Sequence, residues 1–555
     1  MAFVFWGFRY PYALAYHEQF QFFLFDGTYF CERLAVPGGL AQYIAEFFVQ
    51  MYNNIYIGAA IVALMFVVIQ LLSWMLMKRY SLRTEDGIWY PFSFLIPILI
   101  WALMGDPQVM YAFPFAVILT LFAMIAMPRK YMAKIIFVVI IIPVLYWLAG
   151  PVVLVFSLYA ALSFAIEAKE KSKSILIGVL FLLYSLFCII VSTYMVPYSL
   201  SVLFRGLQYY RFPDVITYSI MFIMLIMALA SFSPLMRFKY RKLTAIVGFI
   251  VVLFCGYLII PNSFDSKVCE LMDYDFMVRK NDWKGVIRKA ENKMPDLPMS
   301  VCATNLALGM TDQLDERGFQ FFQNGTGGLF PPFEKNFTAL LTTAEVYYQL
   351  GLVNSAQRLY FESMECLPDY NKSVRVMKRL AETNIINGQY NVARKYLLLL
   401  KRTLCYSRWA ERTMKLLGNE KAINSHPIYG KLRRYHLRQD FLFSEDELDK
   451  ICGLLFLKDN DNKLAMQYML FYPLLQKNIN KFMQYYMVVN KHVQYMPAHC
   501  QEAEVFAYSQ NQQSPPQGTV SPIILQQFSA FAQTYSQHGN VEGFRNTVWY
   551  YLTKQ

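Results

Sequence analysis

Two arginines in the segment PYSLSVLFRGLQYYRFPDV, residues 197–215, are candidates for binding a phosphate group. Arg205 and Arg211 stand among aromatic residues, which are Tyr209, Tyr210 and Phe212. A guanidinium group binds phosphate through paired hydrogen bonds, and aromatic rings can stack on sugars, so the segment would suit a lipid-phosphate sugar donor. The alternative is a belt of interfacial aromatic residues, in which the two arginines extend to the lipid headgroups.

A second set of ionisable residues lies near the start of the chain. The stretch FDGTYFCERLAVPGG carries Asp26 and Glu32 between strongly apolar segments. Arg9 and the pair His17–Glu18 precede it in an apolar run. A charged group at membrane depth is costly and is therefore a functional candidate. The alternative is a shorter, tilted first helix, which would leave these charges near the lipid headgroups.

The elements that hold these residues differ sharply in composition on the two sides of residue 261. Of the 555 residues, 56% are hydrophobic and 16% are charged, whereas an ordinary soluble chain has about 25% charged residues. Nearly all long apolar runs fall before residue 262. We therefore predict a transmembrane helical domain over 1–261, with an outer amphipathic loop over 26–54, and a globular domain over 262–555.

Several apolar segments approach the roughly 20 residues that a membrane-spanning helix needs. They are 2–25, 55–77, 89–104, 108–127, 133–149, 151–167, 175–196, 216–236 and 243–261. The third and fourth segments are separated only by GDPQ, which contains Asp106, and the fifth and sixth only by Gly150 and Pro151. Both pairs have the pattern of tight helical hairpins, and the sequence predicts about nine spans.

Basic residues alternate between the loops in the way that sets membrane orientation. The loops after the second, fourth, sixth and eighth segments hold 13 basic residues, whereas the other loops hold only Arg33, Arg205 and Arg211. This split predicts an inner-membrane protein with a cytoplasmic N-terminus, and places the acidic stretch and residues 262–555 on the periplasmic side. It also accounts for most of the formal net charge of +13, so we expect no nucleic-acid partner.

The residues after the PGG turn have the pattern of an amphipathic helix. In LAQYIAEFFVQMY, one helical face carries Leu40, Ile44, Phe47, Phe48 and Met51, and the other carries Gln42, Glu46 and Gln50. Such a helix is suited to lie in the plane of the membrane interface. The first span would then lead through an acidic turn into an in-plane helix on the outer side.

Residues 262–555 have helical rather than strand periodicity, and two of their segments align. AEVYYQLGLVNSAQRLYFESMECLP and AETNIINGQYNVARKYLLLLKRTLC share alanines that allow close helix packing and a glycine, Gly351 or Gly388, suited to a turn. The pattern resembles the tetratricopeptide repeat, although the offset of 37 exceeds the usual period of about 34 residues. We predict an all-α fold with an irregular tetratricopeptide-like domain, whose stacked helices would offer a binding groove. The alternative is an ordinary helical domain.

Cysteine and histidine show no metal-site spacing. None of the nine cysteines forms a CxxC motif, and free cysteines commonly serve as small buried apolar residues. Disulfides remain open for a protein outside the cytoplasm. His492 and His499 have no acidic pair in register. We therefore predict no metal site of the structural zinc type.

The order of span, acidic turn and in-plane helix is similar to the first external loop of the C-type glycosyltransferases, which use lipid-phosphate sugar donors. In that family an acidic residue in this loop acts as a base or metal ligand. The resemblance is one of layout over about half the chain, and it implies catalytic roles for Asp26, Glu32 and Asp106 and donor contacts for Arg205 and Arg211. It would allow a divalent cation as cofactor. Two departures are the lack of a paired acidic motif beside Asp26 and the very short second outer loop.

Over most of its length the chain also resembles an uncharacterised family of polytopic bacterial envelope proteins. The resemblance rests on FRYPYALAYHEQFQFFLF, the outer loop with PGG, and the helical repeats. That family implies no activity. We expect a membrane-embedded protein whose external repeats recruit or scaffold cell-envelope protein partners, and the alternative is a C-type-like glycosyltransferase. The residues leave open whether the protein is an enzyme.

Overall fold

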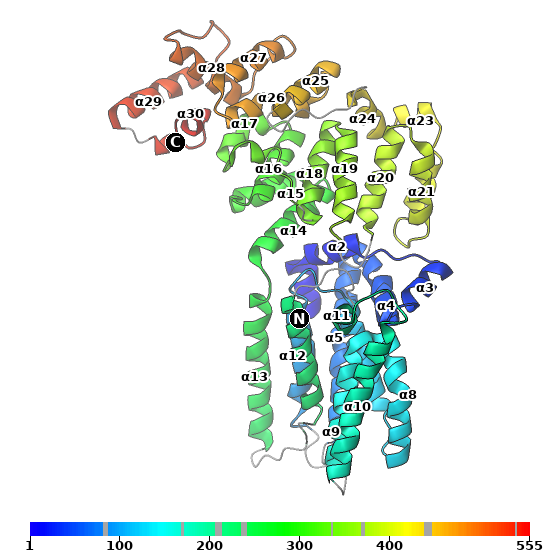
Figure 1. Ribbon diagram of the computed structural model, residues 1–555. Helices are drawn as coiled ribbons and strands as arrows, with labels where there is room; N and C mark the ends of the chain where they lie inside the picture. Colours follow the sequence, from blue (N-terminus) through cyan, green and yellow to red (C-terminus); the bar gives the residue numbers. More distant parts are fainter. Residues whose placement is uncertain are drawn as a thin grey trace. The chain divides into compact units, whose positions relative to one another are not determined.

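The protein is all-α, as predicted. The computed structural model describes residues 1–80, 87–167, 171–205, 214–232, 234, 241–334, 337–367, 372–437, 447–538 and 541–554, and these contain helices and no strand. The chain forms two compact units (Figure 1). The first unit comprises Met1–Cys269, Leu367–Val374 and Leu399–Trp409, and the second comprises Glu270–Cys366, Arg375–Leu398 and Ala410–Gln555.

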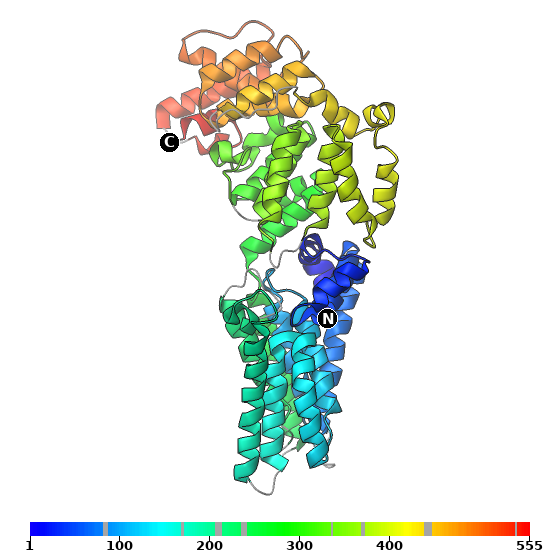
Figure 2. The same cartoon turned by 45° about the vertical axis from the view of Figure 1, so that its right-hand side comes forward.

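The first unit is a bundle of apolar helices. Figures 1 and 2 show its long helices side by side, with α2, α3, α4 and α11 at one end of the bundle. The helices are α1 Ala2–Val4, α2 Pro11–Phe20, α3 Gly27–Leu34, α4 Gly39–Val49, α5 Ile55–Lys78, α6 Leu95–Leu103, α7 Ala112–Ala126, α8 Tyr131–Ala149, α9 Val153–Glu167, α10 Lys171–Ser192, α11 Leu200–Arg205, α12 Asp214–Ala230 and α13 Arg241–Asn262. A π-helical turn, Phe5–Arg9, and 3₁₀ turns at Gln50–Asn53, Tyr90–Phe94 and Gly150–Val152 join them.

Four helical stretches in the described residues are long and apolar enough to cross a membrane. They are Ile55–Lys78, Tyr131–Glu167, Ser172–Ser192 and Lys242–Asn262. Shorter apolar helices cover Tyr90–Leu103, Ala112–Ala126 and Ser219–Ala230. These lengths are compatible with a membrane protein, while the count of about nine spans stays a prediction.

The stretch Tyr131–Glu167 folds back on itself as the hairpin predicted at Gly150 and Pro151. Gly150 has a φ of 67°, a left-handed conformation that favours glycine. At the far end of the hairpin, Lys134 Nζ in α8 lies 2.9 Å from Glu167 Oε2 in α9. The turn thus joins two antiparallel helices of the bundle.

The segment predicted as the first span, residues 2–25, is not a single helix. Its backbone leaves the helical conformation at Tyr10, and Pro11 then occupies the first turn of α2, because proline favours a helix start and cannot donate a backbone N–H. Helix α2 ends at Phe20, and Gln21 is extended. At 1.5 Å per residue, α2 is about 15 Å long, roughly half the hydrocarbon thickness of a bilayer.

Helix α4 is amphipathic, as predicted, but its polar side chains point into the protein. Gln42 and Glu46, and Gln50 just after the helix, are buried. The apolar residues on the other face are only half-buried, and these are Leu40, Ile44, Phe47, Phe48 and Met51. A helix lying on the interface would turn its polar face to water, so this arrangement differs from the expected one. Its cause is that Glu46 meets hydrogen-bonding partners on α3, while Gln42 donates to Glu46 and Gln50 Oε1 accepts from the N–H of Leu404.

The second unit consists of short helices joined mostly by short turns. The helices from residue 266 onward are α14 Ser266–Arg279, α15 Trp283–Asn292, α16 Pro298–Met310, α17 Leu314–Arg317, α18 Phe337–Leu350, α19 Val353–Met364, α20 Val374–Ile386, α21 Tyr390–Lys401, α22 Ser407–Met414, α23 Glu420–Asn424, α24 Tyr429–Tyr435, α25 Leu448–Lys458, α26 Lys463–Leu475, α27 Ile479–Val489, α28 Ala498–Gln510, α29 Pro522–His538 and α30 Val548–Thr553. The 3₁₀ turns are Gly318–Gln320, Gly325–Gly328 and Glu542–Phe544.

The two aligned segments each form a helix–turn–helix unit. Gly351, with a φ of 97°, joins α18 to α19, and Gly388, with a φ of 75°, joins α20 to α21. Both angles lie in the left-handed region that the predicted turns require. A side chain at Gly351 would also place its Cβ 2.7 Å from Tyr435 Cβ. The wider repeat architecture stays a prediction, because two pairs do not establish a regular stack.

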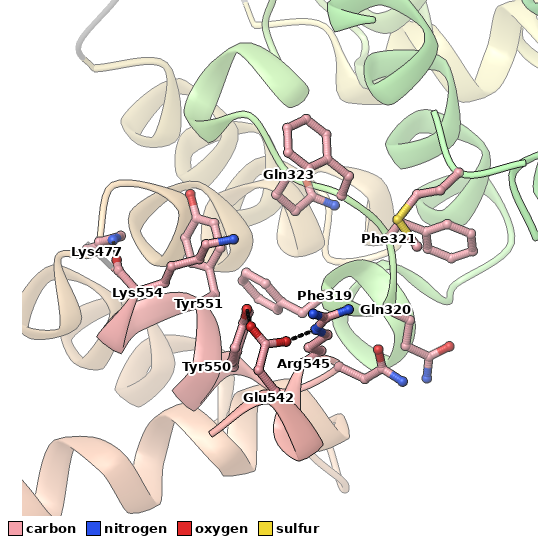
Figure 3. Close-up of a pocket in the computed structure, with 13 residues that line it drawn as sticks. Phe319, Gln320, Phe321, Gln323, Lys477, Glu542, Arg545, Tyr550, Tyr551 and Lys554 are labelled. Carbon is pink, nitrogen blue, oxygen red and sulfur yellow. Dashed lines mark hydrogen bonds and ion pairs between the residues drawn. The ribbon is translucent and has the colours of Figure 1, made fainter. Parts of the chain in front are cut away.

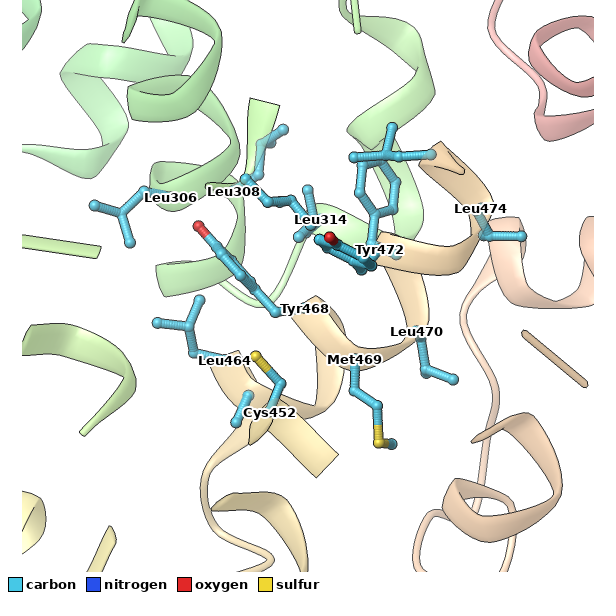
Figure 4. Packing of buried hydrophobic residues seen from close by; sticks show 14 of the residues in the cluster. Leu306, Leu308, Leu314, Cys452, Leu464, Tyr468, Met469, Leu470, Tyr472 and Leu474 are labelled. Carbon is cyan, nitrogen blue, oxygen red and sulfur yellow. The ribbon is translucent and has the colours of Figure 1, made fainter. Parts of the chain in front are cut away.

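The core of the second unit centres on α26. Every residue of this helix from Leu464 to Leu475, apart from Met466, is buried, as expected for a helix that is apolar on all sides. Figure 4 shows Tyr468 and Tyr472 of α26 beside leucines of α16 and α17, with Cys452 of α25 nearby. None of the nine cysteines forms a disulfide in the described part of the protein.

A buried ion-pair network links α14, α18 and α20. Arg379 contacts Glu345 through two nitrogens, with Nε 3.0 Å from Oε1 and Nη2 2.9 Å from Oε2. Arg375 Nη1 lies 2.8 Å from Asp275 Oδ2, and Arg379 Nη1 lies 2.7 Å from Glu382 Oε2. Glu345 is fully buried. The network thus ties three helices together through charges that are buried or largely buried.

Candidate functional site

Asp26, the principal predicted catalytic residue, has a structural role at the start of α3. Its side chain accepts a hydrogen bond of 3.3 Å from the backbone N–H of Thr28, as an N-cap residue does. Its other oxygen lies 2.6 Å from Arg402 Nη1, in the segment Leu399–Trp409 of the same unit. Asp26 therefore holds a helix start and an ion pair, which the sequence did not predict.

The other predicted site residues are not joined to Asp26. Glu32 is exposed on α3, and Asp106 accepts a hydrogen bond of 2.8 Å from the N–H of Gln108. Burial raises the pKa of Asp106. Among the described residues, no hydrogen bond or ion pair links these three carboxylates, and no group of three or more His, Cys, Asp or Glu side chains is arranged to hold a metal ion. Their catalytic roles stay predictions.

The two predicted phosphate-binding arginines are only partly placed. Arg205 is the last residue of α11, at the same end of the bundle as α3 and α4 (Figure 1). Arg211 lies outside the residues that the structure describes. The paired phosphate contact therefore stays a prediction.

A buried polar cluster between α3 and α4 was not predicted from the sequence. Glu46 Oε2 accepts hydrogen bonds from Arg33 Nε, at 2.9 Å, and from the hydroxyl of Tyr29. Glu46 Oε1 accepts from Gln42 Nε2 at 3.1 Å. The Arg33 guanidinium also lies over the Tyr29 ring, 4.9 Å from its centre. A spacing of four residues joins Tyr29 to Arg33 and Gln42 to Glu46, and this spacing was the available signal.

The same end of the bundle buries a second carboxylate. Glu18 of α2 is almost fully buried, and its Oε1 accepts a hydrogen bond of 3.1 Å from the hydroxyl of Tyr406 in the segment Leu399–Trp409. His17 beside it is also buried.

Burial raises the pKa of Glu46 in the cluster between α3 and α4, although Arg33 acts in the opposite direction. A carboxyl group with a raised pKa can exchange a proton closer to neutral pH than an exposed one.

The second unit contains a cavity of about 630 Å³ whose walls are aromatic and basic (Figure 3). Its aromatic residues are Phe319, Phe321, Phe322, Tyr550 and Tyr551, and its charged residues are Lys477, Arg545, Lys554 and Glu542. They come from the turn after α17, from the end of α26 and from the C-terminal region around α30. Residues this far apart in sequence give no pattern that could have predicted the cavity.

Several contacts fix the walls of this cavity. Glu542 pairs with Arg545 and accepts a hydrogen bond of 3.2 Å from the Tyr550 hydroxyl. Lys477 and Lys554 lie over the rings of Tyr551 and Tyr550, each 5.6 Å from the ring centre. Among the described lining residues, three cations thus face one carboxylate, which is already paired. The cavity therefore favours a ligand that carries negative charge beside apolar groups.

The chain belongs to the family of unknown function DUF6057, whose family model matches residues 1–555. This confirms that the chain belongs to an uncharacterised family, while the polytopic envelope character and the C-terminal repeats expected of that family stay predictions. No curated protein and no solved structure matches the chain. The family match assigns neither a reaction nor a repeat, so function is argued from the residues themselves.

Proposed function

We propose that the protein is a multi-pass membrane protein whose extracytoplasmic helical-repeat domain, residues 262–555, recruits protein partners in the cell envelope. The aromatic and basic cavity of the second unit carries this proposal. Aromatic and arginine side chains are the residues that most often anchor protein partners, and the cavity presents both. The partner segment would carry carboxylates beside aromatic or aliphatic side chains.

The position of this domain on the outer side rests on the loop charges. The split of 13 basic residues against three does not depend on a span over residues 2–25. This segment is broken at Tyr10, and its longest helix, α2, has 10 residues. If it does not span the membrane, the loops keep their sides, but the N-terminus would lie on the outer side with residues 262–555. We therefore propose this position in place of the cytoplasmic N-terminus first expected.

The orientation predicts that Cys31 reacts from outside the membrane. Cys31 and Cys405 are the two exposed cysteines, so the experiment uses the Cys405→Ser protein in intact spheroplasts with a membrane-impermeant maleimide. We expect labelling without permeabilisation and its loss in the Cys31→Ser, Cys405→Ser protein. Labelling of Cys31 only after permeabilisation would contradict the orientation and place the acidic stretch in the cytoplasm.

The cavity predicts selective binding of acidic, aromatic peptides to the full-length protein in nanodiscs. The probes are a fluorescent peptide of alternating glutamate and phenylalanine and its counterpart with glutamine in place of glutamate. We expect tighter binding of the acidic peptide, measured by fluorescence anisotropy, and a loss of affinity of about tenfold in Lys554→Glu, because like charges repel across an interface.

Lys491→Glu is the matched control for this measurement. Lys491 is exposed in the same unit but does not line the cavity, so the change in net charge is the same. We expect this variant to bind the acidic peptide nearly as well as the unaltered protein. Equal affinity for the two peptides, or an equal loss in both variants, would count against the cavity as a partner site.

A further inference from the structure

A second cavity, of about 420 Å³, lies in the first unit where α5 and α7 both end. Its lining includes Lys78, Arg79 and Arg129, together with the apolar side chains Met75, Ile125 and Met127. Among the described lining residues there is no carboxylate. Lys78, Arg79 and Arg129 also belong to the basic loops that are predicted to face the cytoplasm.

Arg79 is held in place by the end of α7. Its Nη1 lies 3.5 Å from the carbonyl oxygen of Met124 and 3.4 Å from that of Ile125, and Nη2 lies 3.4 Å from that of Pro128. The last turn of a helix leaves carbonyls without intrahelical donors, although the Met124 carbonyl also accepts from the backbone N–H of Met127 at 3.4 Å. Arg79 Nε is buried and has no hydrogen-bond partner in the described part of the protein.

The other two cations of this cavity remain near solvent. Lys78 and Arg129 are exposed, and Lys78 Nζ lies 5.2 Å from the centre of the Trp74 ring, within the range of a cation–π contact. Tryptophan beside lysine at the end of an apolar helix is typical of the level of the lipid headgroups. Met75, which lines the cavity, is 53% exposed and continues the apolar surface of α5.

We propose that this cavity binds the phosphate group of an anionic membrane lipid. The three cations supply the charge for one phosphate, and the exposed apolar surface beside them can receive the start of an acyl chain. Basic pockets between membrane helices are suited to this class of ligand. A free phosphate ion would use the same cations but not the apolar wall, so the lipid is the source that the lining favours.

The test uses the full-length protein in detergent and native mass spectrometry. The probes are phosphatidylglycerol, phosphatidylcholine and inorganic phosphate, each added alone. In a competition experiment, inorganic phosphate is added to protein that already has phosphatidylglycerol bound. We expect preferential retention of phosphatidylglycerol over phosphatidylcholine. We expect affinity to fall about fivefold in Arg129→Gln and in Lys78→Gln, as one surface cation contributes to binding an anionic lipid. Arg79 is left unchanged because it caps α7.

Lys130→Gln is the matched control, since Lys130 is the exposed neighbour of Arg129 but does not line the cavity. We expect it to retain the affinity of the unaltered protein. Equal binding of the two lipids, or an equal loss in Lys130→Gln, would overturn the proposal by showing non-specific attraction. Displacement of the lipid by inorganic phosphate at comparable concentration would overturn the lipid assignment and indicate a free-phosphate site.

Discussion

Replacement of Glu345 by glutamine is expected to destabilise the second unit by about 3–5 kcal/mol, the usual cost of removing one partner from a buried ion pair. Glu345 is fully buried and accepts from Arg379, at 2.9 and 3.0 Å, and from the Tyr360 hydroxyl, at 2.9 Å. Glutamine would leave the buried guanidinium groups of Arg379 and Arg375 with one fewer negative charge.

Hydrogen exchange in the full-length protein measures this effect, because it reports the free energy of opening for each segment. We expect faster exchange in peptides from α18 and α20 of Glu345→Gln. Glu447→Gln removes one partner of an exposed pair with Lys450, and such pairs contribute little, so this control should exchange as the unaltered protein does. Unchanged exchange in Glu345→Gln would show that the network does not hold these helices together.

The same network should make the second unit sensitive to acid. Burial by itself would raise the pKa of Glu345, but Arg379 and Arg375 outweigh it and leave the pKa lowered. A carboxyl group with a lowered pKa stabilises the folded state above its ordinary pKa, about 4.3, and this contribution is lost as pH falls towards the folded pKa. Glu345→Gln should therefore lose less stability than the unaltered protein as pH falls below about 4.3.

Phe471→Ala is expected to cost a similar amount, about 3–5 kcal/mol, through the cavity that it would leave. Phe471 of α26 is fully buried, and its ring centre lies 4.7 Å from that of Phe319, which lines the aromatic and basic cavity of the second unit. The packing is close, since a Cβ on Gly318 would lie 2.5 Å from the Phe471 ring. We expect faster hydrogen exchange in peptides from α26 and α17.

Phe361→Ala is the matched control for Phe471→Ala. Phe361 is 43% exposed on α19, so the same side chain is removed with a smaller loss of buried area, and exchange should change less than in Phe471→Ala. Phe471→Ala should also weaken binding of the acidic, aromatic peptide, because Phe319 would lose its support. Normal exchange in α26 after Phe471→Ala would mean that the core collapses around the gap at small cost.

The sequence by itself was sufficient for the elements whose pattern is local. Apolar runs of span length predicted α5, α10 and α13, because the membrane requirement can be counted along the chain. Gly150 and Pro151 predicted the hairpin of α8 and α9, and Gly351 and Gly388 predicted two helix–turn–helix units, because these residues control backbone angles at their own positions. The break before Pro11 in the segment 2–25 was not predicted, since the segment is apolar along most of its length.

Only the tertiary structure decided which faces and charges meet. The amphipathic pattern of α4 defines two faces of the helix, but it does not indicate that Glu46 turns inward to Arg33. Arg402 is 376 residues from Asp26 in the chain, and the aromatic and basic cavity of the second unit draws its walls from four distant segments. Such contacts depend on how helices pack, and side-chain periodicity specifies a helix's faces without specifying the neighbour that each face will contact.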